Sequence, residues 1–173
     1  MKSWPIIKSC RTLLLVCGLT LSPITVLDVH AAPKSPPLGH CNAQAEIINL
    51  QGLNFGEIVA VSSGNVSVDT NGFRSGSGGV VLVGGVVSEA LFELTSQVGC
   101  AVYGHTILFP SSTTLSSGAN TMMVDGFVHA LITPALVDAS GYGQVQVGAT
   151  LHVGNNQPSG DYAGQFTMEI VFQ

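Results

Sequence analysis

Residues 162–172 read Tyr-Ala-Gly-Gln-Phe-Thr-Met-Glu-Ile-Val-Phe, and their alternation decides the fold class. Polar Gln165, Thr167 and Glu169 fall between positions that are mainly apolar. A period of two places alternate side chains on one face of a strand, whereas an α-helix cannot gather them on one face. The pattern therefore predicts a closing strand whose core side chains are Tyr162, Phe166, Met168, Ile170 and Phe172.

The segment before it, residues 144–153, alternates just as cleanly. Its apolar face is formed by Val145, Val147, Ala149, Leu151 and Val153. A polar loop at residues 154–160 joins the two segments, so we predict that they form an antiparallel pair.

Shorter runs of the same kind fill the rest of the chain. They cover residues 53–61, 66–68, 80–83, 89–95, 106–109 and 122–131. Asn71-Gly72 is suited to a tight turn, because both residues tolerate positive backbone angles. Residues 80–83 are continuously apolar, which favours a central strand buried on both faces. In all, the sequence predicts an all-β fold of about eight antiparallel strands without a helix.

Composition excludes several classes of protein. Of 173 residues, 46% are hydrophobic, only 9% are charged and 21 are Gly. These values argue against a coiled coil, a helical bundle, a disordered acidic tail and a basic nucleic-acid binder. The length, after subtraction of an export signal, fits one domain.

The N-terminus has the tripartite order of a secretory signal peptide. Three basic residues precede the apolar residues 12–21, which Pro23 follows, and Val29-His30-Ala31 supplies small residues for cleavage. We predict a signal peptide at residues 1–31, cut between Ala31 and Ala32. An uncleaved membrane anchor is the less favoured alternative, because the apolar stretch is short for a bilayer span.

The mature chain is divided into a lead-in and a domain. Residues 32–44 contain three Pro and predict an extended lead-in, and residues 45–173 form the β-sandwich domain. Lys34 and Arg74 are then the only Lys or Arg, against nine carboxylates, for a net charge of −7. Nucleic acid and anionic membranes are therefore excluded as partners, and no transmembrane segment is expected in the mature chain.

Two cysteines remain after signal cleavage, Cys41 and Cys100. An even pair in an oxidising compartment predicts one disulfide. A catalytic cysteine is less favoured, because the chain supplies little positive charge to stabilise a thiolate.

We find no pattern typical of an enzyme. Ser75 and Ser77 lack the G-x-S-x-G spacing of a nucleophile elbow. The four mature histidines, His40, His105, His129 and His152, lie in no metal-binding spacing. Glu89 and Glu93 share one strand face, which is more typical of a solvated surface. We therefore predict no catalytic residue, no metal and no cofactor.

Four segments together resemble one family of secreted bacterial domains. Residues 53–58, Leu-Asn-Phe-Gly-Glu-Ile, are similar to its L-x-F-G-x-I opening. Residues 78–85, 147–154 and 160–166 are similar to its later motifs in the same order. The family is catalogued as domain of unknown function 4402, and the resemblance covers roughly residues 45–172.

The resemblance implies an exported, immunoglobulin-like β-sandwich similar to subunits of bacterial surface fibres. Such subunits often carry an N-terminal arm of alternating apolar residues that completes a neighbour's sheet. Here residues 33–40 offer only Leu38 as an apolar anchor. Residues 45–50 are the one candidate arm, or else the domain's own first strand.

The leading functional prediction is a secreted fimbrial or pilin-like subunit, or a surface adhesion module, that associates through strand edges. Its partners would be copies of itself or related fibre subunits, with a periplasmic chaperone before assembly. It would act in the periplasm or on the bacterial cell surface. The alternative is a monomeric binding module that recognises a glycan or protein through the loops at residues 99–105 and 111–120. A small hydrolase is a third, less favoured class, because no nucleophile and base are placed together.

Overall fold

The computed structural model describes residues 3–6, 46–102 and 104–172. This part of the chain contains eleven strands and no helix, which confirms the all-β prediction. The strands are β1 (Ser3–Ile6), β2 (Glu46–Gln51), β3 (Asn54–Val68), β4 (Arg74–Ser88), β5 (Ala90–Thr95), β6 (His105–Leu108), β7 (Ser112–Ser117), β8 (Asn120–Leu131), β9 (Tyr142–Val153), β10 (Gly164–Thr167) and β11 (Glu169–Phe172).

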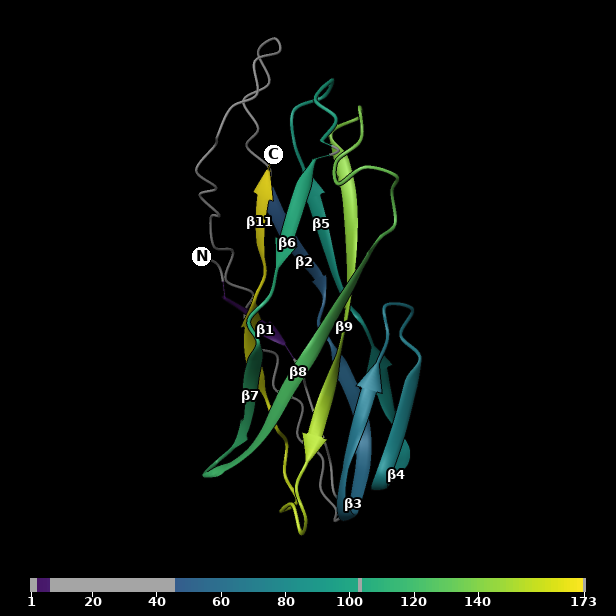
Figure 1. The fold of residues 1–173 in the computed structure, drawn as a ribbon, viewed down its shortest axis with the longest axis vertical. Coiled ribbons are helices and arrows are strands. Elements are labelled where there is room, and N and C mark those ends of the chain that lie inside the picture. Colours follow the sequence, from purple (N-terminus) through teal and green to yellow (C-terminus); the bar gives the residue numbers. More distant parts are fainter. Residues whose placement is uncertain (1–2, 7–45, 103, 173) are drawn as a thin grey trace.

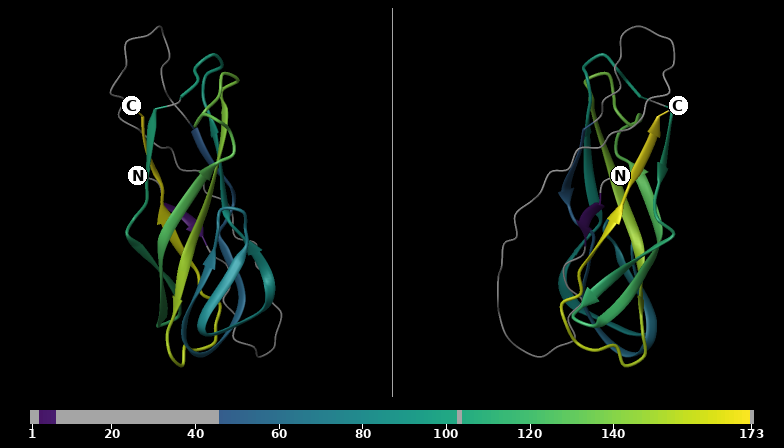
Figure 2. Two further views of the ribbon diagram at one scale, coloured as in Figure 1. Left: turned by 45° about the vertical axis from the view of Figure 1, so that its right-hand side comes forward. Right: turned by 90° about the vertical axis from the view of Figure 1, so that its left-hand side faces the viewer.

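The strands form the two layers of a β-sandwich (Figure 1, Figure 2). The larger sheet has seven strands. Five follow the path β2-β5-β9-β3-β4, and outside this path β8 pairs with β9 and β7 pairs with β8. The smaller layer contains two antiparallel pairs, β6 with β11 and β10 with β1. The expected number of about eight strands is exceeded partly because the closing run is divided at Met168 and partly because residues 3–6 add β1.

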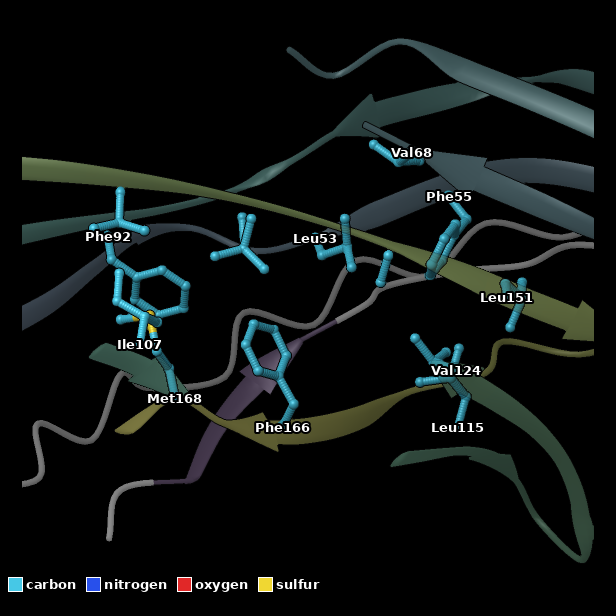
Figure 3. Close-up of a cluster of buried hydrophobic side chains, with 14 of the residues drawn as sticks. Leu53, Phe55, Val68, Phe92, Ile107, Leu115, Val124, Leu151, Phe166 and Met168 are labelled. Carbon is cyan, nitrogen blue, oxygen red and sulfur yellow. The ribbon is translucent and has the colours of Figure 1, made fainter. Parts of the chain in front are cut away.

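The core lies between the two layers. Tyr162, Phe166, Met168 and Ile170 of the closing run are at most 3% exposed. Figure 3 shows Phe166 and Met168 reaching from the smaller layer toward Phe92 of β5. Ala90, Phe92 and Leu94 of β5 are fully buried, as the alternation of residues 89–95 predicts. The side chain of Phe172 lies outside the described part of the chain.

The predicted pairing of the last two alternating segments is wrong. Strand β9 pairs with β3, β5 and β8, whereas β10 pairs with β1 and β11 pairs with β6. The loop at residues 154–160 carries the chain from one layer to the other instead of making a hairpin. Consecutive strands of a sandwich often cross between sheets in this way, and alternation alone cannot show it.

The prediction of a central strand at residues 80–83 is also wrong. These residues belong to β4, the last strand on the path of the larger sheet, and Val81 and Val83 are about half exposed, at 51% and 53%. A short apolar run is compatible with several environments, so the pattern could not distinguish them. Two register shifts each insert an extra residue into β4, between the partners of Phe55 and Ile58. These bulges interrupt the outer edge of the strand.

The β3–β4 ribbon doubles back on itself. Arg74 lies opposite Val68 at the turn end of the ribbon. Its guanidinium Nη1 nevertheless donates to the carbonyls of Phe55, Glu57 and Gly84 near the other end, at 2.9, 3.2 and 3.1 Å. Arg74 therefore links the turn end of the β3–β4 ribbon to its opposite end.

Gly56 makes this contact possible. Its φ is +72°, in the left-handed region that favours Gly. A Cβ at Gly56 would collide with the Arg74 guanidinium and the Gly84 carbonyl. The G of the L-x-F-G-x-I motif is thus required both by its backbone angle and by the arginine beside it.

The segment that could have been a free arm is the first strand of the domain. Residues 46–51 form β2, which pairs with β5 in the same chain, and Ile47 is buried. Ala45 lies outside the described residues.

The closing run gives a direct test of the core. Ile170→Asp would bury an unpaired carboxylate, so we expect it to lower the free energy of unfolding by more than about 4 kcal/mol or to prevent folding. Glu169→Lys, one residue away on the exposed face, is the control and should change it by less than about 0.5 kcal/mol. Urea denaturation followed by circular dichroism measures both. Equal effects of the two substitutions would contradict the assigned faces.

Candidate functional site

The candidate site is the edge of β10. On one side β10 approaches β7, where Ala163 and Ser116 exchange two backbone hydrogen bonds of 3.0 and 2.8 Å. On the other side lies β1, paired over the whole of β10 from Ser3 opposite Thr167 to Ile6 opposite Gly164. This second side of β10 is therefore occupied by residues from the extreme N-terminus of the chain.

Gly164 sets the close approach of β10 to β7. A Cβ at this position would collide with the carbonyl oxygen of Thr114 and the side chain of Leu115. Gly164 thus stands where β10 begins, because a larger residue would push β10 away from β7.

Tyr162 anchors the chain before β10 starts. Its side chain is 1% exposed, and its hydroxyl donates to the carbonyl of Pro158 at 2.7 Å. The same hydroxyl accepts a hydrogen bond from Gln157 Nε2 at 2.9 Å. A buried Tyr bonded to the backbone a few residues upstream is a tyrosine corner, a feature of immunoglobulin-like sandwiches. These hydrogen bonds hold the loop between β9 and β10 and so orient the start of β10.

Phe166 anchors β10 to the larger sheet. Its ring centroid lies 4.9 Å from that of Phe127 on β8 and 6.0 Å from that of Phe92 on β5, the latter in an edge-to-face arrangement. Phe109 stacks on Phe127 at 5.7 Å and contacts Phe166 at 6.0 Å. These separations are those of favourable aromatic pairs. The contacts of the Phe166 ring with the core consequently hold the backbone of β10 in place.

Two histidines lie beside this cluster. The ring of His129 is 5.8 Å from that of Phe109. Partial burial lowers the pKa of His129 from its ordinary value, and the neighbouring His105 lowers it further. Both effects favour the neutral imidazole.

The third described histidine is elsewhere. His152 Nε2 lies 2.7 Å from Asp125 Oδ1 on the β9–β8 pair, and Ser67 and Thr150 are hydrogen-bonded at 2.9 Å on the neighbouring strands. His40 is outside the described residues. In the part that the structure covers, no three His, Cys, Asp or Glu side chains are grouped closely enough to hold a metal ion.

The remaining candidate residues do not come together. Ser75 and Ser77 are exposed on β4. Glu89 accepts a 3.4 Å hydrogen bond from Gln146, and Glu93 lies beside Tyr142, whose pKa is raised mainly by desolvation and also by that carboxylate. Neither pair of residues forms an acid–base arrangement with a nucleophile.

The two loops of the binding-module alternative do not converge on one surface. Residues 99–102 pair with the loop after β8, through Gly99 to Ala139 and a Val102–Val137 bridge. Residues 112–117 are strand β7, and its turn lies at the other end of the molecule (Figure 1). A ligand would therefore contact one of these segments but not both.

Several predicted features lie outside the described residues. These are the cleavage site at Ala31 and Ala32 and the disulfide partner Cys41. Cys100 is 7% exposed in the loop after β5. The Cys41–Cys100 disulfide and the signal cleavage therefore stay predictions. Among the described residues, no helix is long and apolar enough to cross a membrane.

The pairing of residues 3–6 with β10 has no counterpart in the sequence prediction. Residues 3–6 lie between Lys2 and Lys8. From the sequence, this stretch is assigned to the basic start of an export signal. A four-residue segment containing Pro carries too little alternation to predict a strand.

Comparison with known proteins identifies one family. The model of the family described as Domain of unknown function (DUF4402) matches residues 46–172, which include every described strand except β1. No curated protein and no solved structure matches the chain.

The tyrosine corner can be tested with a matched pair of substitutions. Tyr162→Phe removes the hydroxyl and leaves the Pro158 carbonyl without this donor, so we expect the free energy of unfolding to fall by about 1–2 kcal/mol. Tyr142→Phe, at a tyrosine that is more than one third exposed, should have an effect of less than about 0.5 kcal/mol. Chemical denaturation gives both values. A neutral Tyr162→Phe would show that the corner does not stabilise the crossing.

Proposed function

This chain belongs to the DUF4402 family, and we propose that it is an exported structural subunit that joins other chains through an open β-sheet edge. The proposal places it in the periplasm or on the bacterial cell surface, as a fimbrial or pilin-like subunit or an adhesion module. Its partners are other copies or related subunits, with a periplasmic chaperone covering the edge before assembly. The proposal assigns it no catalytic activity.

One observation carries the proposal, the pairing of β1 with β10. All of β1 belongs to the predicted signal peptide at residues 1–31. Cleavage after Ala31 would remove β1 and leave the N–H and C=O groups on that side of β10 without a strand. An unpaired edge of this kind readily accepts a strand from another chain.

The other sheet edges are less suitable for this purpose. Strand β4 has two bulges in its register with β3, and bulges twist an edge away from regular pairing. The register of strand β2 with β5 shifts between Asn49 and Gln51. These irregularities favour the edge of β10 as the point of association.

We predict that the exported protein starts at Ala32 and forms assemblies larger than a monomer. The full gene is expressed with its own signal, and the exported product is purified without denaturation. N-terminal sequencing reports the cleavage site, and light scattering with electron microscopy reports the assemblies. A protein that retains residues 1–31 in the membrane, or one that is strictly monomeric at all concentrations, would contradict the proposal. The monomer would favour the binding module instead.

A disulfide between Cys41 and Cys100 follows from export to an oxidising compartment. The two residues lie 59 positions apart, so in the chain-entropy model the bond stabilises the fold by about 4 kcal/mol. Cys41→Ser should lower the unfolding midpoint of the exported protein under oxidising conditions, and the difference should disappear in reductant. Titration of two free thiols in the native, non-reduced protein would show that the pair is absent.

A further inference from the structure

The two sides of β10 can be assigned from its hydrogen bonds. Ala163 exchanges its backbone bonds with Ser116, and the Gln165 carbonyl accepts a bond from Thr113 Oγ1, so both residues turn their polar groups toward β7. Successive residues of a strand direct these groups to opposite sides. Gly164 and Phe166 therefore turn their N–H and C=O groups toward the side where β1 lies.

The register of β1 agrees with this assignment. Trp4 is opposite Phe166 and Ile6 is opposite Gly164, whereas Pro5 is opposite Gln165. Pro has no N–H to donate. Because Gln165 turns its polar groups away, Pro at that register position forfeits no hydrogen bond with β10. Proline is therefore compatible with this edge opposite Gln165, and not opposite Phe166 or Gly164.

The faces of β10 fix what the paired strand must carry. Residues directly opposite each other in an antiparallel pair project to the same face of the sheet. Phe166 is buried in the core, and Gln165 is exposed. A partner residue opposite Phe166 or Gly164 must accordingly be apolar, and the residue between them faces solvent.

Among the residues that the structure describes, the domain has no free segment with this pattern. Residues 46–51, the one candidate arm, are engaged with β5 as strand β2. The only strand described on this side of β10 comes from residues 3–6, which are predicted to be lost on export.

We propose that the mature domain takes at this edge an extended segment of another polypeptide, antiparallel to β10, with apolar residues opposite Phe166 and Gly164. Proline is tolerated between those two residues. The inference rests on the proposed function, because it names the kind of partner that the open edge selects. It goes further in fixing the direction, register and side-chain spacing of that partner.

The position of the C-terminus allows a decisive variant. Strand β11 ends close to the C-terminus, and a chain that turned back there would run antiparallel to β11 and then to β10 (Figure 1). The exported protein is extended after Gln173 by a tight turn, a polar spacer that passes β11, and the sequence Ser-Trp-Pro-Ile. This extension would place the same four residues opposite Thr167 to Gly164 as in β1.

Two control extensions test the spacing. In one, Asp replaces both the Trp and the Ile of the extension, which would put charges on the core face. In the other, Ala replaces only the Pro. We expect the original and the Ala extension to raise the thermal midpoint by about 5 °C or more and to reduce assembly at least tenfold. The Asp extension should do neither.

The outcomes separate this inference from the proposed function. If the unextended protein assembles and no extension affects either assembly or the thermal midpoint, the edge assignment is wrong, while the structural role stands. If the unextended protein is monomeric and the original extension still raises the midpoint, the edge is correct and the structural role is wrong. Equal stabilisation by the Asp extension would overturn the alternating requirement, and loss of stabilisation with Ala would overturn the register of the proline position.

Discussion

Phe166 is the point on which the two layers of this sandwich depend. Its ring contacts Phe127 of β8 and Phe92 of β5, so a single side chain of the smaller layer touches two strands of the larger sheet. The backbone of the same residue turns its hydrogen-bonding groups toward β1. The side chain therefore fixes β10 in the core while the main chain remains available for pairing at the edge, and a firmly held edge can select its partner strand.

The sequence predicted the faces of strands better than their neighbours. The alternation of residues 162–172 identifies Phe166 and Ile170 as core residues, because a period of two is a local property of a strand. The same argument failed for the pairing of β9, since the chain crosses between layers at residues 154–160 and no local pattern encodes that crossing. Residues 80–83 were misplaced because an apolar run says little about what covers it, and Val83 proved to be on the last strand of the sheet.

The candidate site was only half visible in the sequence. The strand that presents the edge was predicted, and so was association through strand edges. The occupant, residues 3–6, was not, because these residues carry the charges and position of an export signal and too short a pattern for a strand. The role of Arg74 was equally hidden. Its bonds to Phe55 and Gly84 join residues that come together only after the β3–β4 ribbon has folded back.

The lengthwise pairing of strands at β10 has a mechanical consequence. Interstrand hydrogen bonds lie across the strands, so a force applied along β10 would load the bonds of the pair together, in shear, rather than breaking them one after another. Strands pulled apart from one end, in contrast, unzip bond by bond under a smaller force. In a chain of subunits joined lengthwise at this edge, tension would load the interstrand hydrogen bonds in shear, the more resistant of the two modes. The aromatic contacts of Phe166 would transmit that tension to the core.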